Sequence, residues 1–145
     1  ALYSILTTHL LKFKESFQLR TDMTLQELTD ILANPENSKI EFKREGERPE
    51  RIAKEIVAFA NFRGGHLIFG VDDATREIVG ITNERFEQWL MDTVFGRYVK
   101  PFIIPIYQEI MTEKGRVAVV SIEQGVLKPY MVQEGDRQTP YIRIG

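Results

Sequence analysis

Four acidic side chains are of a type that could support metal chemistry. Glu36 and Glu41 lie five positions apart, and Asp72 and Asp73 follow an apolar run further along the chain. Mg²⁺ and Mn²⁺ bind carboxylate oxygens that converge from different elements, and such a metal can activate water against a phosphate. The structural alternative is that Glu36 is a solvated loop residue and that the aspartates occupy a hairpin turn, where aspartate is favoured. The pattern alone does not choose between the two.

Basic side chains recur around the same stretch and could neutralise phosphates, which gives an affinity that falls steeply with salt. Arg51 and Lys54 are three positions apart and share a helical face. Glutamates interleave with them, so a salt-bridged solvent face explains the pattern as well. Tyr130 and Tyr141 could stack on bases or lie half-buried at strand edges. The candidates for nucleic-acid contact are Lys39, Lys43, Arg44, Arg51, Lys54, Arg63, Lys128 and Arg143.

Periodicity and helix caps predict the elements that carry these residues. Positions 39–43 alternate between charged and apolar, which predicts a half-buried strand with a charged outer face. Pro49 suits a first helical position, and Gly64 with Gly65 suits the end of that helix. The glycine turn could expose N–H groups to a phosphate or simply allow close packing. The apolar run from His66 to Val71 predicts a central strand, in which we expect His66 to be structural.

The flanking segments predict further helices and strands. Thr24 caps a helix that begins at Leu25, and Asn83 caps another of about a dozen residues, closed by Gly96 and by Lys100-Pro101. Together the segments predict an α+β fold in a single domain, a mixed β-sheet with helices packed mainly on one side. Strands are expected near residues 78–81, 102–109, 117–122, 130–132 and 141–144. The strand at 102–109 contains Pro105 and is expected at a sheet edge.

Residues 1–22 have apolar positions at helical spacing but no basic start and no small-residue cleavage site. A signal peptide is therefore not expected. We leave open whether this segment is an extra docking helix or a leader that precedes a start at Met23. The domain is expected to span residues 23–145.

The composition bounds the possible classes of protein. A chain of 145 residues fits one domain with a real core, and a net charge of −2 argues mildly against a dedicated nucleic-acid coat protein without excluding a local basic face. The absence of cysteine excludes disulfides and thiolate metal sites and suits a reducing cytoplasm. No apolar run approaches the roughly 20 residues that span a bilayer.

Several of these segments together resemble a known family. The order E-x-x-x-x-E-F-K, A-F-A-N-x-x-G-G, L-I-F-G-V-D-D and I-V-G, followed by K-P-Y and Y-I-R-I-G, is similar to the Schlafen/AlbA-type DNA-binding domain, also called divergent AAA. The similarity covers about residues 25–145, most of the chain. Phe62-Arg63 departs from the family, which usually has a small polar residue before the glycines.

The resemblance implies a nucleic-acid-binding module, with DNA favoured over RNA. Such modules lie at the N-terminus of longer bacterial transcription regulators or RecG-type helicase-related proteins, so we expect a cytoplasmic piece of a longer protein. An alternative is a metal-dependent, RNase-like nuclease, because three acids of the matching motifs hold the metal in Schlafen relatives. Here those acids would be Glu36, Glu41 and Asp73, with Mg²⁺ or Mn²⁺.

A third possibility is a protein-interaction or homodimerisation module, whose candidate surfaces are the possible helix in residues 1–22 and the strand edge near Pro105. No G-x-x-x-x-G-K-[ST] sequence occurs, so the residues of this segment do not support ATP binding despite the family's name.

Overall fold

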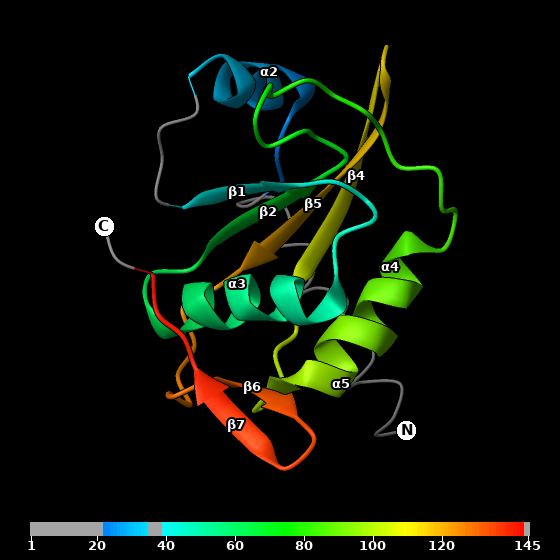
Figure 1. Ribbon diagram of the computed structural model, residues 1–145. Helices are drawn as coiled ribbons and strands as arrows, with labels where there is room; N and C mark the ends of the chain where they lie inside the picture. The colour runs from blue at the N-terminus through cyan, green and yellow to red at the C-terminus, as the bar shows by residue number, and fades with distance from the viewer. Residues whose placement is uncertain (1–21, 35–38, 144–145) are drawn as a thin grey trace, which may run out of the picture.

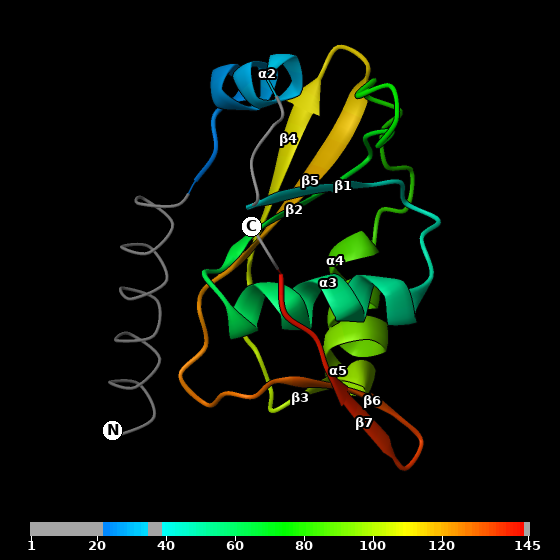
Figure 2. The same cartoon turned by 60° about the vertical axis from the view of Figure 1, so that its left-hand side comes forward.

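A four-stranded sheet lies at the centre of the fold, and a smaller three-stranded sheet lies at one end (Figures 1 and 2). The structure, a computed structural model, describes residues 22–34 and 39–143. The elements are α2 (Leu25–Ala33), β1 (Ile40–Lys43), α3 (Pro49–Asn61), β2 (Gly65–Phe69), α4 (Phe86–Trp89), the π-helical turn η1 (Leu90–Phe95), α5 (Gly96–Tyr98), β3 (Val99–Lys100), β4 (Ile106–Thr112), β5 (Gly115–Ile122), β6 (Met131–Glu134) and β7 (Arg137–Pro140).

The central sheet has the strand order β1-β2-β5-β4, with β1 and β2 parallel and the other neighbours antiparallel. The parallel pair is joined through α3, as a parallel connection requires. Most of β5 is buried, as its apolar run predicts. β4 lies at an edge and begins directly after Pro105, which has no N–H for a ladder hydrogen bond. The predicted α+β class and mixed sheet are confirmed.

Helices cover the two faces of this sheet unequally. α3 and the continuous helical segment α4–η1–α5 share the larger core, in which Ile56 and Phe59 lie with Leu67 and Phe69. The short helix α2 covers the other face through Leu28, and its cap is the predicted one, since Thr24 Oγ1 accepts a hydrogen bond from the Glu27 N–H at 3.0 Å. The prediction of helices mainly on one side is confirmed.

The charged face of β1 points toward α3. Ile40 and Phe42 belong to the core under α2. In the register, Glu41 stands beside Leu67 and Lys43 beside Phe69, and both of these partners lie in the core under α3. Residues side by side in a sheet point to the same face. The acid and the lysine therefore lie at the sheet edge that α3 flanks.

Several details differ from the sequence-based expectation. Asn83 does not cap the helix that follows it, since α4 begins at Phe86 and its N-cap is Arg85. The strand expected at 102–109 begins only at Ile106. The helix after Asn83 continues through Gly96 to Tyr98, because Gly96 has ordinary helical backbone angles. The strand expected at 78–81 is reduced to one bridge, between Val71 and Ile78. Residues 141–143 form no strand; they follow β7 as irregular chain, held by side chains of α3 and β1. The segment 1–21, including the possible leader helix, lies outside the described residues.

Candidate nucleic-acid interface

The Gly64-Gly65 turn brings three distant parts of the chain together. Gly64 has φ +73°, and a Cβ there would lie 2.5 Å from the carbonyl oxygen of Ile122. A Cβ on Gly65 would lie 2.3 Å from the ring of Phe59 and 2.7 Å from the Lys39 carbonyl oxygen. Only glycine fits at either position. The end of α3, the start of β1 and the end of β5 therefore meet at this turn.

Backbone N–H groups in and near the turn donate hydrogen bonds to the last carbonyl oxygens of α3. The N–H groups of Phe62 and Gly64 both donate to the Phe59 carbonyl oxygen, at 3.1 and 2.8 Å, and Gly125 N–H donates to the Ala60 carbonyl oxygen at 2.8 Å. These contacts cap the last carbonyls of α3. The close-packing interpretation of the glycines therefore fits.

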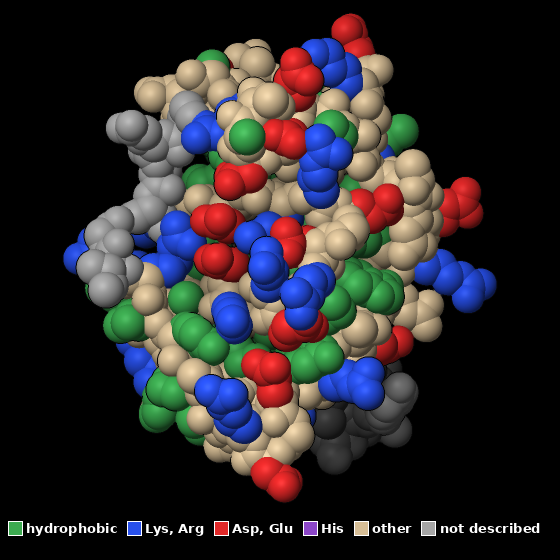
Figure 3. All heavy atoms as spheres, in the orientation of Figure 1, with side chains coloured by type: hydrophobic (Ala, Val, Ile, Leu, Met, Phe, Trp, Pro, Cys, Tyr) green, Lys and Arg blue, Asp and Glu red, His purple; other side chains and the backbone are tan. Residues whose placement is uncertain are grey.

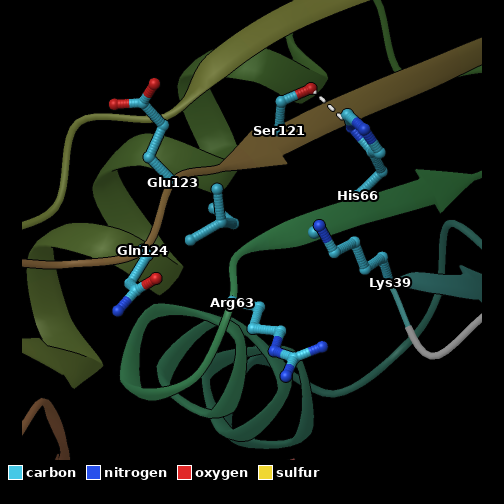
Figure 4. A pocket seen from close by; sticks show the side chains of 8 residues that line it. Lys39, Arg63, His66, Ser121, Glu123 and Gln124 are labelled. Atoms are coloured by element: carbon cyan, nitrogen blue, oxygen red, sulfur yellow. Dashed lines mark hydrogen bonds between the residues drawn. The ribbon is translucent and has the colours of Figure 1, made fainter.

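The same turn borders an open hollow of about 470 Å³ (Figure 4). Lys39 extends over the start of β2, Arg63 projects from the turn toward the end of α3, and the His66–Ser121 pair lies on the far side of Lys39 from Arg63. Glu123 and Gln124 line the opposite side. The structure thus brings together two of the predicted cationic residues, Lys39 and Arg63, which are 24 positions apart in the sequence.

His66 and Ser121 form a cross-strand pair between β2 and β5, with Nδ1 and Oγ 2.8 Å apart. Burial, and secondarily the charge of Lys39, lowers the pKa of His66 below its usual value. The ring is therefore neutral at pH 7, and its contact with Ser121 supports the structural role expected for it.

A second charged group ties the end of the described chain to β1 and α3. Arg143 Nη1 lies 2.9 Å from a Glu55 carboxylate oxygen and 3.2 Å from one of Glu41, and its guanidinium lies 4.5 Å from the centre of the Phe59 ring. Burial, followed by the neighbouring Glu41, raises the pKa of Glu55. Lys43 Nζ is 3.9 Å from Glu41. For Lys43 and Arg143 the salt-bridged interpretation thus has direct structural support.

The outer face of α3 carries exposed charge of both signs (Figure 3). Arg51 lies 4.0 Å from Glu47, a marginal ion pair, and its side chain is 63% exposed. Lys54 lies over the ring of Tyr141, 5.4 Å from its centre. Exposed pairs of this kind hold their charges weakly, so a phosphate can compete for them.

The remaining two cationic candidates lie at the borders of this face, Arg44 near Glu47 and Lys128 near Tyr141. Arg44 follows β1 and contacts Asp72 at 2.6 Å. Lys128 is exposed and borders a shallow apolar pocket that includes Tyr141.

Glu41 and the aspartates Asp72 and Asp73, the predicted acids that the structure describes, do not converge on one site. Asp72 accepts hydrogen bonds from the N–H groups of Ala74 and Thr75 and from Arg44; these bonds, that of Thr75 first, lower its pKa to about 2. Asp73 is exposed in the same turn, beyond the end of β1, whereas Glu41 points toward α3. Within residues 22–34 and 39–143, no group of three His, Cys, Asp or Glu could hold a metal.

Glu36 lies outside the described residues. The three-carboxylate site that includes it therefore stays a prediction.

Sequence reasoning missed the role of Asn61, the last residue of α3. Its Nδ2 donates to the carbonyl oxygens of Tyr130 and Tyr141, both at 2.8 Å, and its Oδ1 accepts from the Tyr130 N–H at 2.7 Å. Tyr130 is itself buried, and its hydroxyl accepts from the Leu127 N–H, so stacking on a base is not available to it. In the sequence, the asparagine of the A-F-A-N motif was the signal that could have indicated this role.

These motifs can now be compared with known proteins. The sequence model of the Schlafen, AlbA_2 family matches residues 36–145. The chain belongs to the Schlafen AlbA_2 family. The matched region contains the glycine turn, the hollow and the Arg143 contacts, whereas α2 lies before it.

Individual relatives are more distant. An uncharacterized ATP-binding protein of Ureaplasma parvum is 40% identical over 58 residues, which is 39% of this chain. The match spans only 16% of the length of that relative.

Solved structures share the fold. The N-terminal domain of a protein from Nitrosomonas europaea, described as ATP-dependent DNA helicase RecG-related, superposes with a TM-score of 0.63 at 23% identity, covering 81% of this chain and 86% of that one. The DIP2311 protein of Corynebacterium diphtheriae gives 0.57 at 23% identity, covering 78% of this chain and 28% of that one. None of the described helices is long and apolar enough to cross a membrane.

Proposed function

We propose that this Schlafen AlbA_2 domain binds nucleic acid, DNA in the first instance, by contacts to backbone phosphates. The observation that carries the proposal is the meeting of Lys39 and Arg63 at an open hollow, at the end of α3 whose outer face carries Arg51 and Lys54. Cations placed on one side of a molecule can bind phosphates even when the net charge is negative, because the local potential decides.

The setting of the domain is part of the same proposal. We place it at the N-terminus of a longer cytoplasmic regulator or helicase-related protein. The RecG-related neighbour, itself described as an N-terminal domain, and the much longer ATP-binding relative support this arrangement. ATP binding is not assigned to this segment, because the phosphate-cradling glycine-lysine sequence does not occur in it.

Binding should be measured by fluorescence anisotropy with labelled single- and double-stranded DNA and an RNA hairpin, over a series of salt concentrations. Lys39→Ala and Lys54→Ala should each weaken binding by about 3- to 10-fold and reduce the slope of log affinity against log salt by about 1, because each removes a phosphate contact.

Lys114→Ala is the matched control. It changes an exposed lysine at the opposite end of β5 from Ile122, roughly 20–25 Å away, and should leave affinity unchanged. Salt-insensitive binding, or equal losses in all three variants, would disprove the proposal.

Metal-dependent cleavage is tested in the same samples by adding Mn²⁺ and running the nucleic acids on a gel beside Glu41→Gln. Cleavage by the wild type that is lost in this variant would make the domain a nuclease. Because Glu41 also pairs with Arg143 and Lys43, thermal unfolding must first show that the variant is folded. Intact, shifted bands in both lanes would leave binding as the function.

A further inference from the structure

The hollow at the glycine turn is lined by charged and polar side chains from several elements. Its volume of about 470 Å³ falls within the roughly 300–1,000 Å³ typical of small-ligand sites. The two cationic side chains reach it from different elements, Lys39 from the residue before β1 and Arg63 from the turn after α3. The polar His66–Ser121 pair lines the hollow beside Lys39. A small anionic group could therefore be held from more than one direction.

We propose that this hollow binds a terminal phosphate, a phosphomonoester such as the one at the end of a nucleic-acid strand. The inference rests on the proposed function and specifies it. A phosphomonoester carries close to two negative charges at pH 7 and three free oxygens. Those charges match Lys39 and Arg63, and an oxygen remains for the His66–Ser121 pair. An internal phosphodiester brings only one charge and two free oxygens.

The position of Glu123 favours the end of a strand over its middle. Its side chain lies across the hollow from the cationic side (Figure 4). A strand that continued through the hollow would bring further phosphates toward this carboxylate, and like charges repel. A strand that ends at Lys39 and Arg63 avoids this contact. The backbone N–H groups of Phe62 and Gly64 are already used within the turn, so the proposed recognition is assigned to the side chains.

Arg63 does not pack into the hydrophobic core, so it can be replaced without disturbing the fold. Its side chain is exposed and lies over the neighbouring Phe62 ring, 4.9 Å from its centre. Arg63→Ala therefore removes charge from the hollow without opening a cavity. Arg63→Lys keeps the charge but not the planar fork that binds two oxygens. Arg51→Ala removes an equally exposed arginine on α3, outside the hollow.

The experiment compares one oligonucleotide in three forms, with a 5′-phosphate, a 3′-phosphate or hydroxyl ends, bound to the 145-residue chain in anisotropy titrations. Adenosine monophosphate is titrated separately as a free phosphomonoester. A phosphorylated end should bind about tenfold tighter than hydroxyl ends, the gain of one further charge-assisted hydrogen bond. Arg63→Ala should reduce that ratio to about one, and Arg63→Lys should leave it between the two. Arg51→Ala should keep the wild-type ratio.

The outcomes separate this inference from the proposed function. Tight binding of all three oligonucleotides with no preference for a phosphorylated end would overturn the inference and keep the function. Arg63-dependent binding of adenosine monophosphate without binding of any oligonucleotide would keep the phosphomonoester site and overturn the function. A preference for phosphorylated ends that persists in Arg63→Ala would place that recognition elsewhere and overturn the inference.

Discussion

At the scale of single residues, Asn61 shows how one side chain can hold two motifs. It satisfies both backbone groups of the buried Tyr130 and also the carbonyl of Tyr141. These bonds join the end of α3 to the K-P-Y and Y-I-R motifs, which lie 69 and 80 positions away. A hydrophobic side chain of similar size could fill the space but could not pair these polar groups.

Asn61→Ala should therefore lower the free energy of unfolding by about 2–4 kcal/mol, because it leaves buried backbone groups without partners. Chemical denaturation followed by circular dichroism measures this change. Asn83→Ala serves as the matched control: its Oδ1 accepts one exposed hydrogen bond from Arg85 N–H, so the loss should stay below about 1 kcal/mol. Equal losses in the two variants would contradict this assignment of Asn61.

At the scale of elements, β1, β2 and β5 set which charges meet. The register places Glu41 and Lys43 toward α3, and it places His66 opposite Ser121. The α4–η1–α5 segment also goes beyond the local pattern. Periodicity predicts its helical length but not its π-helical middle, which buries Leu90 and Phe95 in the core, nor its passage through Gly96. Local pattern alone does not contain this information.

The buried pair between β2 and β5 should make folding sensitive to acid. The folded-state pKa of His66 lies below the unfolded value of about 6.5, so the unfolded chain binds the proton first as the pH falls. Its contribution to stability is present above about pH 6.5 and is lost as the pH falls through the folded pKa. Ser121 and the ammonium group of Lys39 are the polar groups that face the ring.

Denaturation at about pH 7 and about pH 5 should show a smaller decrease in the free energy of unfolding for His66→Gln than for the wild type. Asp72 does not affect this comparison. Because its pKa is lowered to about 2, its contribution to the free energy of unfolding is lost only below about pH 4. An identical decrease in both proteins would show that His66 does not carry the effect.

At the scale of the whole molecule, Arg143 links the end of the described chain to β1, at the sheet edge, and to α3. It is 102 positions from Glu41 and 88 from Glu55, and each of these three side chains is less than one-third exposed. The contact closes the fold by joining the C-terminal motif to the first strand. It also places two carboxylates side by side, and the guanidinium between them, together with the ammonium group of Lys43, offsets their repulsion.

Arg143→Ala should lower the free energy of unfolding at pH 7 by about 1–2 kcal/mol, between the values for surface and buried pairs. Burial and the neighbouring Glu41 raise the pKa of Glu55 in the folded state above its unfolded value of about 4.5. The contribution of Glu55 to the free energy of unfolding is therefore largest when this group is protonated, below about pH 4.5. The loss should therefore shrink as the pH falls toward that value. Adding Glu55→Gln to Arg143→Ala should restore part of the stability at pH 7. A loss that stays constant with pH would contradict this account.

The sequence by itself determined the local elements and the family. Alternation defined β1, proline and glycine defined the ends of α3, and Thr24 defined the start of α2, because each depends on neighbours a few positions apart. Only the tertiary structure decided which charges are paired and which two meet at the hollow. Arg143 and Lys43 contact acids, and Lys39 and Arg63 line the same hollow beside the Gly64-Gly65 turn. These meetings depend on register and close backbone approach between distant segments, which no local pattern encodes.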